Sequence, residues 1–261
     1  MDTLQAILLG IVQGITEFLP VSSSGHLQLA KELLGVELEN NITFDVTLHA
    51  ATVLSTIVVL WRELWQLLRG AFSKSFNDEQ RYILNVVVSM IPAGVMGVFF
   101  ADQIEALFSS LWFVGLMLLL TAALLTFAYY AKPRQRSEIT TRDAFIIGLA
   151  QAAATMPGLS RSGSTIATGL LLGCEKSKVA HFSFIMVIPV ILGKMLLDIL
   201  SGEMAAMSVE TGVLISGFVA AFVSGALACK FMIEIVKRGK LIWFALYCAV
   251  VGLVAIIGTL C

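Results

Sequence analysis

A glutamine and a glutamate four positions apart, Gln13 and Glu17, stand in the otherwise apolar residues 10–26, GIVQGITEFLPVSSSGH. On a helix this spacing puts both side chains on one face. A carboxylate oxygen is a hard ligand suited to Mg²⁺ or Ca²⁺, and the amide oxygen of glutamine can join the same shell. We therefore expect a divalent cation at Glu17 and Gln13, with phosphate oxygens of a substrate completing its coordination. The alternative is that Glu17 lies at the surface and is only hydrated.

Ser23 and His26 are three positions apart and follow Pro20. If a helix begins after the proline, they share a face of its first turn, where a hydroxyl and an imidazole can act as nucleophile and base. The N–H groups of such a helix start, together with Ser22 and Ser24, would bind an anion. The residues leave open whether the serine or the histidine attacks. They also leave open a plainer reading, in which the serines cap the helix and the histidine packs.

An arginine among hydroxyl groups marks a second segment, residues 148–165, GLAQAAATMPGLSRSGST. Arg161 is flanked by Ser160 and Ser162, and Thr165 follows one turn later. A guanidinium binds phosphate through two parallel hydrogen bonds, and hydroxyl and backbone N–H groups add further hydrogen-bond donors. The alternative is that Arg161 extends from a loop to the membrane surface. Together the two segments supply cation ligands, a nucleophile with a base, and a phosphate clamp, which are the parts that phosphoryl transfer requires.

The elements that must position these residues are membrane helices. Of the 261 residues, 58% are hydrophobic and 13% are charged, whereas a soluble domain has about 25% charged residues. The mean hydropathy is +0.90. This composition predicts an all-α polytopic membrane protein in contact with lipid, and we expect no nucleic-acid partner.

Two short apolar regions are each broken by a proline and a Ser/Gly-rich turn, giving the pairs 4–35 and 143–174. Such broken pairs are typical of re-entrant segments, which are tolerated at membrane depth only where protein or a polar cavity surrounds them. Other segments approach the length of about 20 apolar residues that a crossing needs. These six predicted transmembrane helices are 44–61, 82–101, 111–131, 179–200, 211–236 and 241–260.

Loop charges predict the orientation. Basic side chains gather in loops 62–81, 132–142 and 237–240, which we therefore expect to be cytoplasmic. With this assignment the pair 4–35 enters from the outer face and the pair 143–174 enters from the cytoplasmic face. The connections on the outer side carry acidic residues: Glu37, Glu39, Asp102, Glu105, Glu203 and Glu210.

The two halves of the chain resemble each other. Each half contains one broken pair and three crossings, so the halves have opposite orientations. We expect a single membrane domain, residues 1–261, built as an inverted-topology repeat with repeat 1 at about 1–131 and repeat 2 at about 140–261. A shift of 138 positions (151 − 13) aligns Gln151 with Gln13, Gly148 with Gly10, Ser160 with Ser22, Ser162 with Ser24 and Gly163 with Gly25.

Three motifs resemble those of one known family. Residues 13–17 are similar to its (E/Q)xxxE motif, residues 20–26 to its PVSSxGH motif, and residues 157–165 to its PGxSRSxxT motif. The family is the undecaprenyl-diphosphatases, also called bacitracin-resistance proteins, and the similarity extends over essentially the whole chain.

The resemblance implies a metal-dependent enzyme of the bacterial inner membrane. Such an enzyme removes one phosphate from undecaprenyl diphosphate, which recycles the lipid carrier for peptidoglycan synthesis and confers bacitracin resistance. The resemblance also implies a site open to the outer, periplasmic face and an interdigitated inverted-repeat fold, often in a homodimer.

The roles that the resemblance implies can be given residue by residue. Many members have glutamate where this chain has Gln13, so position 13 is not an essential base here and we rank Glu17 above it. The implied roles are metal binding and acid chemistry for Glu17 with Gln13, and nucleophilic attack and proton transfer for Ser23 and His26. Ser160, Arg161 and Thr165 would bind the diphosphate.

Two other function classes fit part of the pattern. An inverted repeat is a transporter architecture, so the chain could be a transporter or flippase of a polyprenyl phosphate lipid that uses the same site. An intramembrane serine protease would use Ser23 and His26 but has no role for Arg161. His49 and His181 lie outside the motifs, and we expect each to be a buried, hydrogen-bonded core residue.

Overall fold

The computed structural model describes residues 1–36, 42–108, 110–131, 136–200 and 210–259. The β-structure within these ranges is one isolated bridge between Arg136 and Cys174. Glu37, Glu39 and Glu203, used above for orientation, lie outside the described residues, as do residues 132–135. The helices are α1 (Thr3–Phe18), α2 (Ser23–Leu33), α3 (Ile42–Val59), α4 (Trp61–Ala71), α5 (Asp78–Phe99), α6 (Ala101–Leu107), α7 (Leu111–Tyr130), α8 (Thr141–Ala153), α9 (Arg161–Leu171), α10 (Lys176–Leu200), α11 (Thr211–Arg238) and α12 (Ile242–Gly258).

Four helices, α5, α7, α10 and α11, are long and apolar enough to cross a membrane. A fifth crossing is reached if α3 and α4 count as one span, although the chain bends by 79° between them. The apolar helix α12 has 17 residues and falls short of that length. The protein is therefore an all-α, multi-pass membrane protein. By length, four or five of the six predicted crossings are found, because α3 ends at the bend before α4 and α12 has 17 residues.

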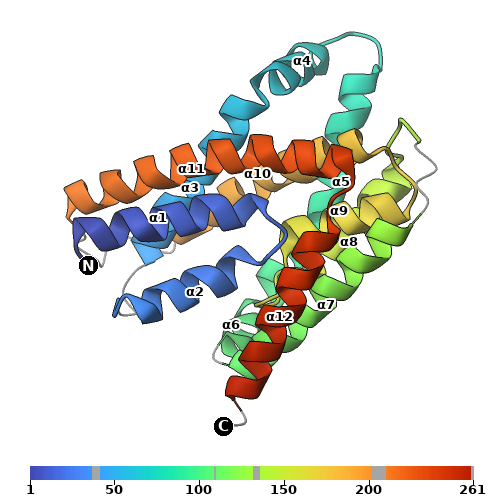
Figure 1. Ribbon diagram of the computed structural model, residues 1–261. Helices are drawn as coiled ribbons and strands as arrows, with labels where there is room; N and C mark the ends of the chain where they lie inside the picture. The colour runs from blue at the N-terminus through green and yellow to red at the C-terminus, as the bar shows by residue number, and fades with distance from the viewer. Residues whose placement is uncertain (37–41, 109, 132–135, 201–209, 260–261) are drawn as a thin grey trace.

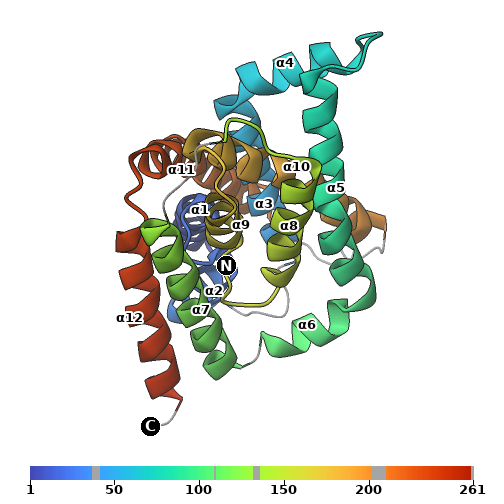
Figure 2. The same ribbon diagram turned by 90° about the vertical axis from the view of Figure 1, so that its right-hand side faces the viewer.

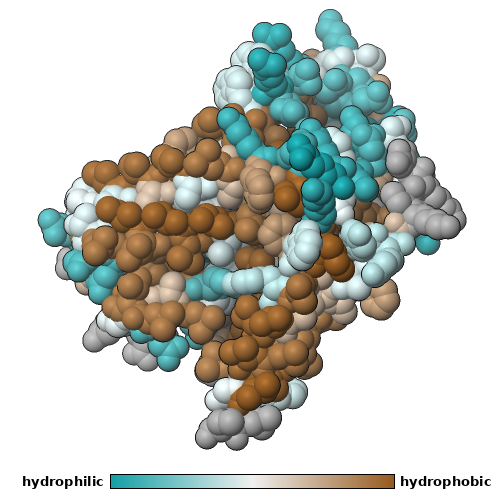
Figure 3. All heavy atoms as spheres, in the orientation of Figure 1, coloured by the Kyte–Doolittle hydropathy of each residue, from teal (hydrophilic) through white to brown (hydrophobic). Residues whose placement is uncertain are grey.

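Apolar side chains cover most of the visible surface. The largest group of polar side chains lies at one end, and smaller groups lie on the opposite side (Figure 3). Figure 3 shows hydrophobic residues over α1, α11 and α12, and hydrophilic residues around α4 and the neighbouring loops. At that end Arg81 is 3.9 Å from Glu138, and Lys176 lies against Gly239. The described parts of the basic loops thus meet at the same end of the molecule.

The helices α1 and α2 form one hairpin, and α8 and α9 form a second (Figure 1). The base of the first is closed by Gln5, whose Nε2 donates to the carbonyl of Leu34 at 2.9 Å. The base of the second is closed by Arg136, whose N–H donates to Gly173 and whose carbonyl accepts from the N–H of Glu175.

The tips of the two hairpins touch in the middle of the molecule. Ser162 Oγ donates to the carbonyl of Leu19 at 3.1 Å, and a Cβ on Gly163 would lie 3.2 Å from Pro20. Around them α7 packs beside α12 and α8 beside α5 (Figure 2). The serine-rich turns that the sequence singled out are therefore in direct contact.

Glycines let α1 lie close against α11. A Cβ on Gly14 would come within 2.5 Å of the carbonyl oxygen of Ala221, and a Cβ on Gly10 within 2.4 Å of that of Gly217. Because real Cβ atoms do not approach backbone this closely, a larger side chain must push the helices apart. This close packing fixes the depth and rotation of α1, which carries Glu17.

We expect Gly14→Leu to destabilise the protein by roughly 1–3 kcal/mol or more, because the added side chain meets backbone that cannot move aside. Thermal unfolding of the purified protein in detergent measures the change. Gly94→Leu is the matched control, since a Cβ there would meet nothing within 4 Å. Equal unfolding temperatures for the two variants would contradict the close packing of α1 on α11.

Candidate active site

The centre of the candidate active site is an ion pair between Glu17 and Arg161. Arg161 Nη2 donates to Glu17 Oε1 at 2.5 Å, and the side chains are 21% and 5% exposed, respectively. Glu17 lies in the last turn of α1 and Arg161 is the first residue of α9, so each charge lies at the helix end whose dipole disfavours it. A buried ion pair adds little net stability, because removing two charges from water costs about as much as their attraction returns. Charged side chains inside a membrane protein usually serve its function, so the position of this pair indicates a functional site.

The second oxygen of Glu17 faces Gln13 and His49. Gln13 Nε2 donates to Glu17 Oε2 at 2.9 Å and is 3.1 Å from Nδ1 of His49 on α3. Gln13 is fully buried, and its Oε1 has no hydrogen-bond partner in the described part of the chain. His49 is hydrogen-bonded as expected, but it was wrongly placed in the core: its side chain is 36% exposed and lies 3.9 Å from Glu17.

The backbone is strained where α2 begins. Ser22 has a φ of 70°, the one positive value among the described non-glycine residues, and such values are uncommon for residues with a side chain. Its hydroxyl forms no helix cap and lies 3.4 Å from that of Ser24. The partly exposed Ser23 has its hydroxyl against the Glu17 carboxylate. Backbone strain of this kind clusters at functional sites, and an uncapped helix start suits an anion.

His26 is held by two groups other than Ser23. Its Nδ1 lies 2.9 Å from the carbonyl of Ser22, and because a carbonyl only accepts, Nδ1 carries the hydrogen. Its Nε2 lies 2.6 Å from the hydroxyl of Tyr247 on α12, and the two rings stack. No hydrogen bond joins Ser23 and His26 within the described residues. The predicted serine–histidine contact is thus replaced by a tyrosine that no sequence motif contains.

Most hydroxyls of the second turn hold the fold together. Ser160 caps α9 by accepting from the N–H of Gly163 at 3.1 Å. The hydroxyl of Thr165 contacts that of Ser183 on α10 at 2.6 Å, and Ser162 bonds to the first turn as described above. These three residues are buried. The candidate residues reachable from outside are therefore Ser23, Ser24, His26 and Arg161, which are partly exposed.

The oxygens of Glu17 and Gln13 are of the kind that a hard cation prefers, but two residues supply too few ligands to hold one tightly. No group of three His, Cys, Asp or Glu residues within the described ranges could hold a metal ion by itself. The buried Gln13 Oε1 has no partner, and Glu17 Oε2 faces the same amide. A cation at these oxygens would therefore depend on further ligands, and phosphate oxygens are of the right chemical kind.

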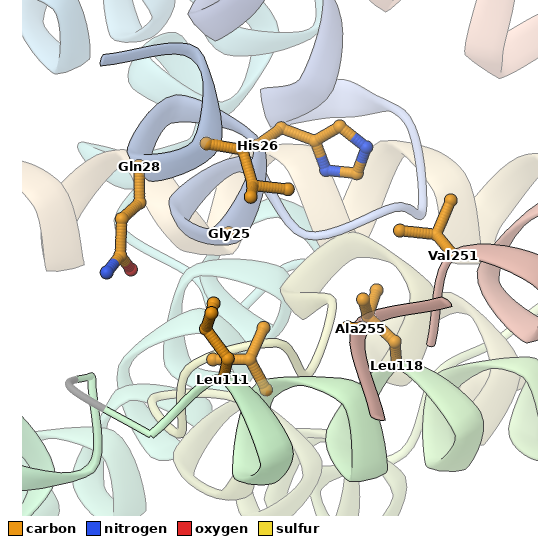
Figure 4. Close-up of a pocket in the computed structure, with 9 residues that line it drawn as sticks. Gly25, His26, Gln28, Leu111, Leu118, Val251 and Ala255 are labelled. Carbon is orange, nitrogen blue, oxygen red and sulfur yellow. The ribbon is translucent and has the colours of Figure 1, made fainter. Parts of the chain in front are cut away.

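An apolar pocket lies beside the imidazole of His26. It is lined by side chains of α2, α7 and α12, and Figure 4 shows His26 at its edge above Leu111, Leu118, Val251 and Ala255. Neither Glu17 nor Arg161 lines it. The arrangement thus places charged groups at the hairpin tips and an apolar wall next to the histidine, as an amphiphilic ligand requires.

Comparisons with known proteins show which proteins the chain resembles. The family model described as bacitracin resistance protein BacA matches residues 6–254. The chain is 60% identical to an undecaprenyl-diphosphatase of Bacteroides fragilis, with 98% of both chains covered. It is also 60% identical to one of Parabacteroides distasonis, over 100% of this chain and 99% of the relative. A protein of the same name from Methanosphaera stadtmanae is 38% identical over 98% of both chains.

Proposed function

This chain belongs to the family of bacitracin resistance protein BacA and is a membrane phosphatase, and from that premise we propose that it hydrolyses undecaprenyl diphosphate to undecaprenyl phosphate and inorganic phosphate. This reaction would recycle the lipid carrier for peptidoglycan synthesis and underlie resistance to bacitracin. The observation that carries the proposal is the Glu17–Arg161 pair where the two hairpin tips meet. The pair brings a guanidinium that would bind phosphate against a carboxylate, and Ser23, one of the two candidate nucleophiles, lies near that carboxylate.

In the proposed reaction the terminal phosphate binds Arg161 and the open N–H groups at the start of α2. Ser23 Oγ attacks the terminal phosphorus and its proton passes to the Glu17 carboxylate, which lies near it. The bond from this phosphorus to the bridging oxygen breaks, and undecaprenyl phosphate leaves. Water then cleaves the phosphoserine and releases inorganic phosphate, with His26 moving the proton. Direct attack by His26 is the alternative, and identifying the side chain that carries phosphate in a trapped intermediate decides between them.

A divalent cation, Mg²⁺ or Ca²⁺, belongs to the proposal. Glu17 and Gln13 would hold it, and its chemistry would be to neutralise charge on the phosphate oxygens. The unpartnered Oε1 of the fully buried Gln13 supports this assignment.

The inverted repeat is also proposed, with the two hairpins as its re-entrant pairs. α1 packs on α11, and α8 packs on α5, so that each hairpin would lie against a crossing of the other repeat. Gly10 and its counterpart Gly148 both approach backbone closely. The hydroxyls of Ser22 and Ser24 are 3.4 Å apart, and those of their counterparts are 3.3 Å apart.

We further propose the bacterial inner membrane as the location, with the active site open to the periplasmic face. The gathering of basic loops at one end supports this, because that end would be cytoplasmic. The base of the α1–α2 hairpin would then face outward. A homodimer, which the family resemblance implies, completes the proposal, and light scattering of the purified protein tests it.

The test of the activity is phosphate release from undecaprenyl diphosphate by the purified protein in detergent, with Mg²⁺ or Ca²⁺. We expect one phosphate per lipid and undecaprenyl phosphate as the second product. Folded protein that releases none would overturn the proposal. A flippase would instead move the lipid head group across a liposome membrane without breaking the diphosphate, so the same protein in liposomes separates the two functions.

We expect Tyr247→Phe to lower kcat about 2- to 10-fold with little change in KM, because it removes one hydrogen bond to His26 worth about 0.5–1.5 kcal/mol. The phenyl ring keeps the stacking contact, so the fold is preserved. Tyr130→Phe is the control, since Tyr130 is 73% exposed. A Tyr247→Phe enzyme with unchanged kcat would show that the tyrosine does not position the imidazole.

A further inference from the structure

His49 lies outside the sequence motifs and has no part in the mechanism proposed above. Three polar atoms from two helices converge beside Glu17: its own Oε2, the terminal amide of Gln13 on the same helix, and Nδ1 of His49 on α3. The amide nitrogen is 2.9 Å from Glu17 Oε2 and 3.1 Å from His49 Nδ1, and the last two atoms are 3.9 Å apart. The two shorter separations are those of hydrogen bonds, so the Gln13 amide bridges Glu17 and His49.

The orientation of the Gln13 amide suggests what is missing. As it lies, Nε2 faces the other two atoms, and the buried Oε1 has no partner. Rotating the amide by half a turn exchanges the two atoms at little steric cost, because they are nearly the same size. An oxygen would then face Glu17 Oε2 and His49 Nδ1. With the imidazole hydrogen on Nε2, three lone pairs would then converge, and a cation between them would bind all three.

The geometry suits a metal ion at that point. Neighbouring ligands of an octahedral ion at about 2.1 Å lie about 3 Å apart, close to two of the three separations seen. In the orientation seen, the contact of Gln13 Nε2 with Nδ1 is a hydrogen bond only if Nδ1 carries its lone pair. The same tautomer would offer that lone pair to a cation once the amide turns. Arg161 bonds to the other oxygen of Glu17, Oε1, and leaves Oε2 available.

We infer that His49 Nδ1 is a third protein ligand of the cation at Glu17 and Gln13, and that this nitrogen makes the site favour Mn²⁺ over Ca²⁺. The inference rests on the cation of the proposed function. Carboxylate and amide oxygens suit Mg²⁺, Ca²⁺ and Mn²⁺ alike, whereas imidazole suits transition metals. His49 would thus supply a ligand from outside the two motifs, in a chain that has glutamine at position 13.

The experiment is binding of Mn²⁺ to the purified protein, followed by electron paramagnetic resonance without substrate. Pulsed spectra detect nitrogen coupled to the metal, and titration against Ca²⁺ gives relative affinity. We expect the wild type to show imidazole coupling. His49→Gln should lose it, with Mn²⁺ affinity weakened on the order of tenfold or more, since even outer-shell partners matter that much. His181→Gln is the matched control and should keep both.

Labelling the wild-type protein with ¹⁵N-histidine shows whether a histidine binds the metal without any substitution. If it does, the nitrogen coupling in the Mn²⁺ spectrum must change with the isotope. Bound Mn²⁺ without histidine coupling would overturn the inference while leaving the cation in place. Absence of any Mn²⁺ binding without substrate would also overturn the inference, because a third protein ligand should hold the ion before phosphate arrives. The cation of the proposed function is tested separately, by the dependence of phosphate release on added divalent cation. Phosphate release, measured separately, tests the proposed activity itself.

Discussion

Arg161→Ala is expected to reduce phosphate release by about 10³-fold or more, the loss typical of an arginine that stabilises transferring phosphate. The substitution removes the guanidinium that would bind the terminal phosphate. It also leaves Glu17, 5% exposed, without its charged partner. The rate with undecaprenyl diphosphate, measured on protein that elutes as a single folded species, checks the expectation. A variant within tenfold of the wild type would contradict the phosphate-binding role.

Two companion variants separate catalysis from folding. Breaking a buried pair by removing one partner typically costs about 3–5 kcal/mol, so Arg161→Ala can also lower stability. Removing Glu17 in the same chain should recover part of that stability but none of the activity. Arg238→Ala is the matched control, because this arginine pairs with Glu234 at the surface, where its side chain is 62% exposed. It should leave both rate and unfolding temperature unchanged.

The second large effect is expected at Glu17. Glu17→Gln keeps the shape and can still contact Arg161, but it removes the charge that would hold the cation and accept the proton of Ser23. We expect a loss of about 10²–10³-fold in kcat, similar to the loss of one strong electrostatic contact with the transition state. Steady-state kinetics at saturating divalent cation measure it.

Gln13→Ala tests the ranking of the two positions. Its amide contributes no charge, so we expect a much smaller loss than at Glu17, about tenfold, at the low end of what changes around a metal site cost. Glu138→Gln is the control, since that side chain is 77% exposed. A Gln13 variant as inactive as the Glu17 variant would refute the ranking and would place the essential oxygen on the glutamine.

The local pieces of the site follow from the sequence. The predicted pairs 4–35 and 143–174 correspond to α1 with α2 and α8 with α9, within a few residues at each end. Proline together with serine and glycine favours a helix break through local backbone and hydroxyl chemistry, whereas the isolated Pro92 and Pro189 lie inside α5 and α10 without ending them. The same local chemistry placed Ser160 at the start of α9, where it caps the helix.

The lengths of the membrane-spanning helices were harder to predict from the sequence. The sequence treated 44–61 and 241–260 as crossings on hydropathy alone, but α3 ends at a sharp bend before α4 and α12 has 17 residues. Hydropathy measures the solvent that a segment prefers. It does not say where packing against neighbours turns the chain.

The sequence by itself thus determined the membrane class, the family motifs, the two broken hairpins and the residue types able to cleave a phosphate. Only the tertiary structure decided which of them meet. Arg161 was expected to seek an anion, and it pairs with Glu17, 144 residues away. His49 and Tyr247 come from apolar helices without a motif, and helix packing turns them toward Glu17 and His26. Contacts of this kind depend on the rotation and depth of whole helices, which glycines such as Gly14 fix and local sequence does not encode.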